Sequence, residues 1–311
     1  MPFGSASLTE GFLSPSGKRI GIIGLDTSHS QVFTEAINNG GPEMAGYKVV
    51  AAYPHGSKDI PSALEMKPKI IEAVKAAGVE IVDSIEELLT KVDVVLLESN
   101  DGRTHYEQAL PVLRAGKRMF IDKPVAATLN DAKRIYAAAN RFNTPIFTSS
   151  ALRFDKNVQK VVQGSIGNVM GADVYTPGTL ERGHLDLAWY AIHGVEMLFT
   201  VMGEGCTSVS RIYQKSTDVI TGVWKDGRIG TVRAIREGAS NIAGTAFGEK
   251  GIAPLGPFSS YDPLINQIIS FFETGEPPVS QAETIEIFSF IKAADVSKEK
   301  DGLAVNLNTV G

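Results

Sequence analysis

The chain has 311 residues, of which 43% are hydrophobic and 21% are charged, and its formal net charge is −5. A chain of this length and composition forms one large or two ordinary globular domains with a sizeable core. The negative charge argues against nucleic acid or an anionic membrane surface as the main partner.

The cysteine content and the N-terminal sequence indicate the cellular compartment of the protein. Cys206 is the only cysteine, which excludes an intramolecular disulfide framework and indicates a reducing environment. No apolar run reaches the length of a membrane span. Residues 1–17 are rich in Gly, Ser and Pro and lack the basic-then-apolar order of a signal peptide, so we expect a flexible arm. These features predict a cytoplasmic protein, with a removed export leader as the alternative.

Short apolar runs alternate with helical patterns through the first half of the chain. The six expected strands are residues 18–24, 47–53, 80–82, 94–97, 119–123 and 145–148. This alternation is typical of a doubly wound parallel sheet. We therefore predict an α/β fold with a dinucleotide-binding Rossmann domain over residues 18–149.

The turn after the first strand departs from the usual phosphate loop. A G-x-G-x-x-G pattern starting at Gly24 needs two further glycines, but Asp26 and His29 stand in their places. The Asp26 carboxylate would repel a pyrophosphate if it pointed inward. Thr27, Ser28 and the helix N-terminus still offer hydrogen bonds to an anion. The alternative for this turn is an ordinary helix cap.

The end of the second strand bears on the choice between NAD and NADP. An acid that binds the ribose hydroxyls usually stands there, but this chain has Tyr53. Ser57 and Lys58 in the following loop suit a 2′-phosphate, and an ordinary polar turn is the alternative. We expect NAD or NADP as the cofactor, with the preference open.

Lys123 ends the fifth expected strand and is followed by Pro124. Proline restricts its own φ and favours an extended conformation for the residue before it. Lys123 is thereby placed at a strand end, which is where open α/β sheets bind ligands. The alternative is a surface lysine after an edge strand.

Four segments together resemble the glucose–fructose oxidoreductase, inositol dehydrogenase and rhizopine-catabolism (Gfo/Idh/MocA) family. They are Glu98-Ser99-Asn100, His105, Ala115-Gly116-Lys117 and Asp122-Lys123-Pro124. The family usually has Glu-Lys-Pro at the strand end, so Asp122 is a mild departure. The resemblance implies that Lys123 contacts nicotinamide ribose and substrate. It also implies that Ser99, Asn100, His105 and Asp122 lie near the cofactor.

The second half groups its strands together. Expected strands at 169–175, 207–213, 219–224 and 230–234 have no helices between the last three, and Asp226-Gly227 indicates a hairpin turn. Helical patterns cover 264–272 and 285–296. We predict an α+β substrate and oligomerisation domain over residues 150–311 with a large antiparallel sheet. The resemblance implies a homo-oligomer formed through that sheet.

Residues 182–196 carry the chemical interest of this half. On a helix, Trp189, Tyr190, His193 and Glu196 would lie on adjoining parts of one face. The resemblance implies a substrate-facing aspartate and histidine four residues apart. His193 matches the histidine, whereas Trp189 replaces the aspartate and is expected to line the pocket. Tyr190 would add a hydroxyl; packing roles for His193 and Tyr190 are the alternatives.

This segment also offers potential metal ligands, and Arg153 is a further basic residue of interest. His184, Asp186, His193 and Glu196 are potential ligands, but their spacing matches no common metal motif, so no metal is expected. Arg153 is a candidate for binding substrate hydroxyls or a carboxylate.

The function predicted from these residues is hydride transfer between NAD(P) and a secondary alcohol of a sugar, polyol or glycoside. His193 would exchange the hydroxyl proton, Lys123 would stabilise negative charge on the oxygen, and Tyr190 would assist. One alternative is a tightly held cofactor used for transient oxidation, as in glycoside cleavage or epimerisation through a 3-keto sugar. Another is a non-catalytic binding protein, suggested by Asp26, Tyr53 and Trp189.

Overall fold

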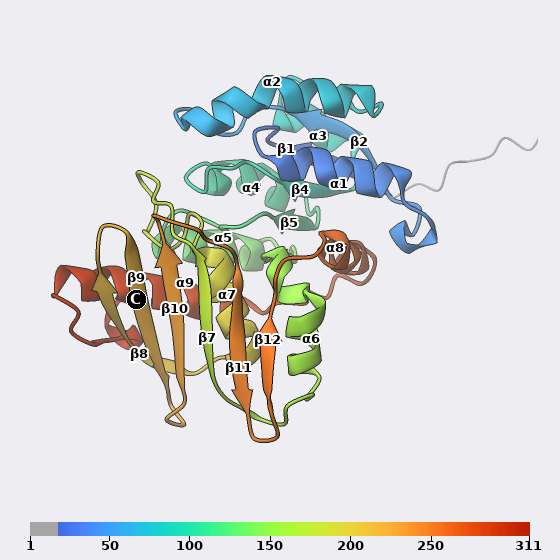
Figure 1. Ribbon diagram of the computed structural model, residues 1–311. Helices are drawn as coiled ribbons and strands as arrows, with labels where there is room; N and C mark the ends of the chain where they lie inside the picture. Colours follow the sequence, from blue (N-terminus) through green and yellow to red (C-terminus); the bar gives the residue numbers. More distant parts are fainter. Residues whose placement is uncertain (1–17) are drawn as a thin grey trace, which may run out of the picture.

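The computed structural model describes residues 18–311 (Figure 1). The arm expected at residues 1–17 lies outside the described residues. Two sheets dominate the molecule, one above the other in Figure 1, and the chain builds the upper sheet first.

The first sheet has six parallel strands, as predicted. They are β1 (Arg19–Ile23), β2 (Lys48–Tyr53), β3 (Glu80–Ile81), β4 (Val94–Leu97), β5 (Met119–Ile121) and β6 (Ile146–Thr148), in the order β3-β2-β1-β4-β5-β6. The order reverses between β1 and β4, and a ligand site is expected outside the carboxyl ends of the strands at such a point.

Helices cover both faces of this sheet because its strands are apolar on both sides. The helices that the chain forms between these strands are α1 (Ser28–Asn39), α2 (Pro61–Ala76), α3 (Ile85–Lys91), α4 (His105–Arg114) and α5 (Leu129–Arg141), with a short 3₁₀ turn at Pro42–Met44. Ser84 caps α3 by accepting from the Glu87 N–H at 3.1 Å, as its capping-box pattern predicts.

One helix from the end of the chain belongs to the first sheet. Helix α8 (Asp262–Thr274) packs beside α1, and its Phe271 ring lies 5.0 Å from Phe147 of β6. Phe33 of α1 shares the same apolar core. The second half of the chain therefore contributes directly to the Rossmann layer.

The second sheet has seven strands in the order β12-β11-β7-β10-β9-β8-β13. They are β7 (Val169–Pro177), β8 (Cys206–Tyr213), β9 (Thr217–Trp224), β10 (Ile229–Ile235), β11 (Ala243–Gly248), β12 (Ile252–Leu255) and β13 (Val305–Asn306). The other elements of this half are α6 (Lys156–Val162), α7 (Ile192–Met202), α9 (Gln281–Glu299) and 3₁₀ turns at Ala151–Phe154 and Leu307–Thr309.

The sheet differs from the expected antiparallel one in a single pairing. Strands β7 and β10 run parallel, while the other neighbouring pairs are antiparallel, so the sheet is mixed and mostly antiparallel. The chain reaches β10 through α7 and a hairpin, and this route brings β10 alongside β7 in the same direction. The Asp226-Gly227 turn joins β9 to β10 as predicted, and Gly227 has a φ of +87°.

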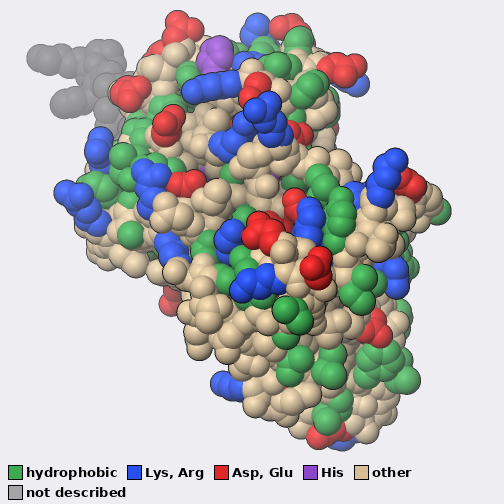
Figure 2. All heavy atoms as spheres, turned by 90° about the vertical axis from the view of Figure 1, so that its left-hand side faces the viewer, with side chains coloured by type: hydrophobic (Ala, Val, Ile, Leu, Met, Phe, Trp, Pro, Cys, Tyr) green, Lys and Arg blue, Asp and Glu red, His purple; other side chains and the backbone are tan. Residues whose placement is uncertain are grey.

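One face of the second sheet packs on helices and the other is exposed. Helices α7 and α9 cover the inner face. Large hydrophobic side chains project from the outer face: Tyr175, Ile212, Ile229, Phe247 and Ile252. Hydrophobic side chains lie along the lower right of Figure 2, on the side of this sheet face, while basic and acidic groups are mixed elsewhere in that view. Among the described residues, no helix is long and apolar enough to cross a membrane.

Candidate active site

Lys123 lies directly beyond the end of β5, as the sequence predicts. Its side chain is almost buried, at 9% exposure, and the Lys123–Pro124 peptide bond is cis. Within residues 18–311, no group accepts a hydrogen bond from its ammonium. An ammonium that is nearly buried and unpaired is suited to bind an oxygen of a ligand.

His193 lies in the first turn of α7, close enough to Lys123 for their charges to interact. Its Nδ1 is 2.7 Å from the Ser150 hydroxyl. Burial, followed by the positive charges of Lys123 and His29, holds the pKa of His193 well below its usual value. His193 is therefore neutral near pH 7 and is suited to accept a proton rather than to supply one.

Tyr190 precedes α7, because the helix on which Trp189, Tyr190, His193 and Glu196 were expected to lie begins only at Ile192. Gly183 has a φ of +85°, and the Leu185 N–H donates to the Ala127 carbonyl, so this segment follows a neighbouring loop. Tyr190 is 39% exposed, and its ring meets His193 edge-on at 5.3 Å. The structure thus brings Tyr190 and His193 together without the predicted helix.

Two buried carboxyl groups lie beside Lys123 at adjacent strand ends. Glu98 follows β4 and Asp122 follows β5, and both Glu98 oxygens and the Asp122 Oδ1 have no hydrogen-bond partner among the described residues. Burial, followed by the charge of Asp122, raises the pKa of Glu98 well above its usual value. Burial alone would raise the pKa of Asp122, but His29 and Lys123 lower it to about 2. The pair therefore favours a protonated Glu98 beside an ionised Asp122.

His29 connects this pair to a residue that the sequence analysis missed. Its Nδ1 lies 2.8 Å from the Asp122 Oδ2, and its Nε2 lies 2.9 Å from the Tyr261 hydroxyl. Tyr261 immediately precedes α8, and burial is the main cause that raises its pKa to about 12. No local pattern identifies Tyr261, because only the packing of α8 beside α1 brings it to His29.

The turn after β1 keeps its expected shape despite its missing glycines. Gly24 has a φ of +89°, and a Cβ there would lie 2.5 Å from the backbone of Ser99. The Thr27 hydroxyl caps α1 by accepting from the His29 N–H at 3.5 Å. Ser28 is exposed at the start of the helix. The N-terminus of α1 can therefore still receive an anion.

Asp26 is fully buried and faces the two neighbouring loops. Its carboxylate accepts from the Ser57 N–H at 2.5 Å and from the Asn100 N–H at 3.1 Å. Gly56 leaves space for this carboxylate, since a Cβ there would lie 2.5 Å from its oxygens. The charge that would repel a phosphate is satisfied inside the protein.

The remaining expected cofactor residues divide into two groups. Tyr53 is partly buried at the end of β2, and Lys58 is exposed in the following loop. His105 is buried and bonds the Val125 and Ser99 carbonyls at 3.1 and 2.7 Å. His105 therefore holds two loops together, whereas Lys58 is free to meet a ligand.

Arg153 and Trp189 have partners within the protein. The Arg153 guanidinium is buried and pairs with Glu283 at 2.7 Å and with Glu196 at 3.6 Å, while its Nε and Nη2 have no hydrogen-bond partner among the described residues. Trp189 meets His184 edge-on at 5.0 Å, and His184 lies 3.4 Å from Asp101.

The four potential metal ligands of the 182–196 segment do not form a cluster among the described residues. Asp186 pairs with Arg211 and Lys298, and Glu196 accepts from the Ser150 N–H at 2.8 Å. A different group is closer: single ligand atoms of His29, Glu98 and Asp122 lie within 4.8 Å of one another. Both ring nitrogens of His29 are already engaged and Lys123 supplies positive charge, so we interpret this group as a proton-sharing cluster.

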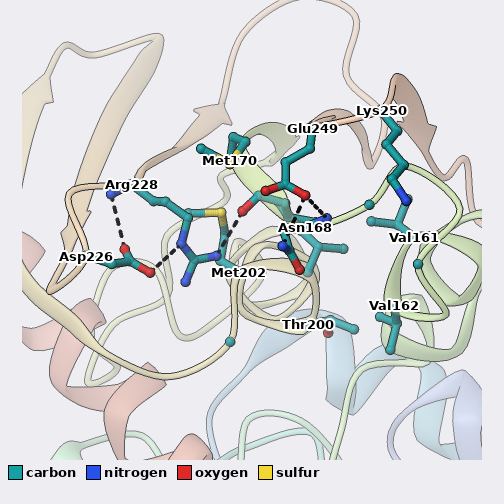
Figure 3. Close-up of a pocket in the computed structure, with 15 residues that line it drawn as sticks. Val161, Val162, Asn168, Met170, Thr200, Met202, Asp226, Arg228, Glu249 and Lys250 are labelled. Carbon is teal, nitrogen blue, oxygen red and sulfur yellow. Dashed lines mark hydrogen bonds and ion pairs between the residues drawn. The ribbon is translucent and has the colours of Figure 1, made fainter.

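A large groove lies at the opposite end of the second domain (Figure 3). Its volume is about 840 Å³, and it is lined by the ends of α6 and α7 and by the β9–β10 and β11–β12 turns. Arg228 pairs there with Asp226 at 2.8 Å, and Asn168 bonds Glu249 at 3.1 Å. These polar groups satisfy one another, so the groove has none of the unpaired buried groups that surround Lys123.

The chain is similar to known oxidoreductases in sequence and in fold. Residues 18–149 match the model of a family described as "Oxidoreductase family, NAD-binding Rossmann fold". The chain is 33% identical over 99 residues to 1,5-anhydro-D-fructose reductase of Ensifer adhaerens, covering 30% of each protein. It is 28% identical over 191 residues to myo-inositol 2-dehydrogenase of Thermotoga maritima, covering 54% of this chain and 56% of the relative. The alignments thus span 30% of the first relative and 56% of the second.

The fold likeness extends over nearly the whole chain. The structure of scyllo-inositol dehydrogenase from Lactobacillus casei with bound NAD(H) and scyllo-inositol superposes with a TM-score of 0.74. The superposition covers 94% of this chain and 99% of that one at 17% identity. At this identity the likeness establishes the fold of both domains.

Proposed function

From the match of residues 18–149 to the family model, we propose that the chain is a Gfo/Idh/MocA family member and an NAD(P)-dependent oxidoreductase acting on a secondary alcohol of a sugar, polyol or glycoside. The observation that carries the proposal is Lys123. Its nearly buried ammonium lies unpaired at the carboxyl edge of the parallel sheet, beside a neutral His193.

The residues present fit a dinucleotide at this edge. Gly24 permits the close approach of β1 and β4, and the N-terminus of α1 offers N–H groups to a pyrophosphate. Lys58 is the exposed basic group available to a 2′-phosphate, so it supports NADP as an option beside NAD. When bound, the nicotinamide supplies the acceptor or donor of the hydride.

The protein groups would handle the substrate oxygen and its proton. Lys123 orients the hydroxyl and stabilises the negative charge that develops on its oxygen. His193, held neutral, is available to accept the hydroxyl proton during oxidation. Tyr190 lies against the His193 ring and is exposed enough to meet the substrate.

Two further properties belong to this proposal. The exposed hydrophobic face of the second sheet supports a homo-oligomer formed through that face. The single, buried Cys206 thiol suits a reducing compartment and supports cytoplasmic placement.

A nucleotide titration followed by a lysine substitution tests the function. Purified protein is first denatured to release any nucleotide carried through purification, and fresh protein is titrated with NAD(H) and NADP(H). Binding of either, followed by oxidation within a panel of inositols, anhydro sugars and glycosides, would support the proposal. Carried nucleotide and product without net redox change would favour the transient-oxidation alternative.

Lys123→Met keeps the apolar stem and removes the charge. We expect it to slow hydride transfer by about 100-fold or more, since removal of one donor to a developing oxyanion has that scale of effect. Lys133→Met, at an exposed lysine of α5, is the matched control. Full activity of Lys123→Met would contradict the proposed role, and absence of nucleotide binding by the natural chain would favour a non-catalytic binding protein.

A further inference from the structure

Three groups from distant parts of the chain form a continuous hydrogen-bonded line beside Lys123. The Tyr261 hydroxyl lies 2.9 Å from the His29 Nε2, and the His29 Nδ1 lies 2.8 Å from the Asp122 Oδ2. We propose that Tyr261, His29 and Asp122 form a proton relay that exchanges the proton of the substrate hydroxyl. This inference rests on the proposed function and adds Tyr261 and His29 to its catalytic groups.

The positions of Tyr261, His29 and Asp122 in the fold indicate a role beyond packing. His29 occupies a position where the dinucleotide-binding pattern has glycine, in the first turn of α1. Asp122 ends β5, and Tyr261 comes from the start of α8. A tyrosine that only packed there could equally be a phenylalanine, because the Phe33 and Phe258 rings already surround it at 5.7 and 4.8 Å.

Because His193 is neutral, a second group is needed to carry the proton of the substrate hydroxyl. Burial and the charge of Lys123 keep His193 neutral, so it lacks the proton that carbonyl reduction requires. His29 differs because its Nδ1 is bonded to the ionised Asp122 and its Nε2 to the Tyr261 hydroxyl. An imidazole oriented by a carboxylate can exchange a proton through its other nitrogen.

The proton transfer balances without any further reactant. In this route, which replaces direct transfer to His193 and leaves His193 to orient the hydroxyl, the substrate O–H proton passes to the Tyr261 oxygen during alcohol oxidation. The Tyr261 proton passes to the His29 Nε2. The hydride leaves the carbinol carbon for the nicotinamide, so a carbonyl and an imidazolium–carboxylate pair remain. Carbonyl reduction runs the same steps backwards. Tyr261 stays a neutral phenol before and after, in keeping with its raised pKa of about 12.

The charged and titratable groups around the relay come from every element that packs on it. Glu98 follows β4, Lys123 follows β5, Tyr190 precedes α7, and His193 lies in its first turn. Lys123 favours the ionised form of Asp122, whereas the carboxyl groups of Glu98 and Asp122 oppose each other's ionisation. The charge of Asp122 is therefore set by the whole group.

Tyr261→Phe removes the hydroxyl and keeps the ring. We expect kcat for alcohol oxidation to fall about 100-fold with KM little changed, in line with the loss of one acid–base group. The pH profile of kcat should change, and so should the solvent deuterium isotope effect, because one fewer proton moves. Tyr136→Phe, which removes another buried hydroxyl, bonded at 3.1 Å to Thr284, is the matched control.

A Tyr261→Phe variant with an unchanged kcat, pH profile and isotope effect would overturn the relay while the proposed function stood. If no substrate is oxidised by the natural chain, the proposed function fails instead, and the relay is still decided by ¹⁵N NMR of the histidines, with His29→Gln for assignment. We expect a His29 Nε2 resonance that shifts in Tyr261→Phe but not in Tyr136→Phe. A His29 that carries protons on both ring nitrogens at the pH of the assay would overturn the relay, because its Nε2 then has no lone pair to accept the proton. A stoichiometric bound metal in the purified protein would overturn it as well.

Discussion

Buried carboxyl groups beside Lys123 lower the stability of the fold. Glu98 is fully buried, and neither of its oxygens has a hydrogen-bond partner among the described residues. Such a group is tolerated only if it is protonated or meets an opposite charge. Lys123 offsets part of the cost, and Asp122 adds to it. An arrangement of this kind is typical of sites where perturbed groups serve a ligand.

The cost of Glu98 predicts a pH-dependent stability. Its pKa is raised in the folded protein above the usual 4.5, so the unfolded chain releases this proton first as the pH rises. Stability is therefore fully present below about pH 4.5 and falls above it, by up to about 1.4 kcal/mol per pH unit, until the folded group ionises. We expect Glu98→Gln to remove this slope and to unfold at higher urea than the natural chain at pH 8.

Urea unfolding of both proteins at pH 5 and pH 8 checks this prediction. The difference between the two proteins isolates Glu98 from other titrating groups. Equal pH slopes in the two proteins would show that Glu98 ionises in the folded state much as it does in the unfolded chain.

At the scale of elements, Asp26 joins three loops that follow β1, β2 and β4. It replaces a glycine of the phosphate loop, yet its carboxylate binds the N–H groups of Ser57 and Asn100. We expect Asp26→Ala to lower the free energy of unfolding by about 3 kcal/mol, because two hydrogen bonds to a charged group are lost. Nucleotide binding should weaken with it, since the loop that carries Lys58 loses its attachment.

Asp26→Asn is the informative comparison for this prediction. Its single amide oxygen keeps one of the two bonds, so its loss of stability should be intermediate. Thermal unfolding with and without NADP(H) measures both effects. Tighter nucleotide binding in Asp26→Ala would mean that the carboxylate obstructs the phosphate rather than supporting the loop.

Local sequence patterns predicted the elements that hold the site but not all of its members. Six apolar runs separated by helical spacing predict the parallel sheet, and Pro124 predicts Lys123 at a strand end. Tyr261 could not be predicted, because its place depends on α8 crossing back to the first sheet. The helix expected to carry Trp189 and Tyr190 begins only at Ile192. Before it, the positive φ of Gly183 and the hydrogen bond from the Leu185 N–H to the Ala127 carbonyl keep the chain in a loop. The parallel pairing of β7 and β10 also depends on the path between strands.

For the whole molecule, the outer face of the second sheet leaves apolar surface exposed. Ile229 lies on the central strand β10 and is 53% exposed, and Ile252 on the edge strand β12 is 70% exposed. Ile229, Phe247 and Ile252 form an exposed apolar row across this face, and such a row typically marks an interface. If the row joins two copies of this chain, a charge introduced at Ile229 should be buried without a partner and should separate the copies.

We therefore expect Ile229→Asp to shift the natural chain from an oligomer to a monomer, measured by light scattering coupled to size exclusion. The control is Leu64→Asp on α2 of the first domain, a hydrophobic side chain that is 43% exposed and lies away from the sheet. Leu64→Asp should leave the mass unchanged. A natural chain that is monomeric at all concentrations, or an Ile229→Asp variant of unchanged mass, would show that this face does not join copies of the protein. Because Lys123, His193 and Tyr261 are not part of the outer face of the second sheet, the monomeric variant should still bind nucleotide.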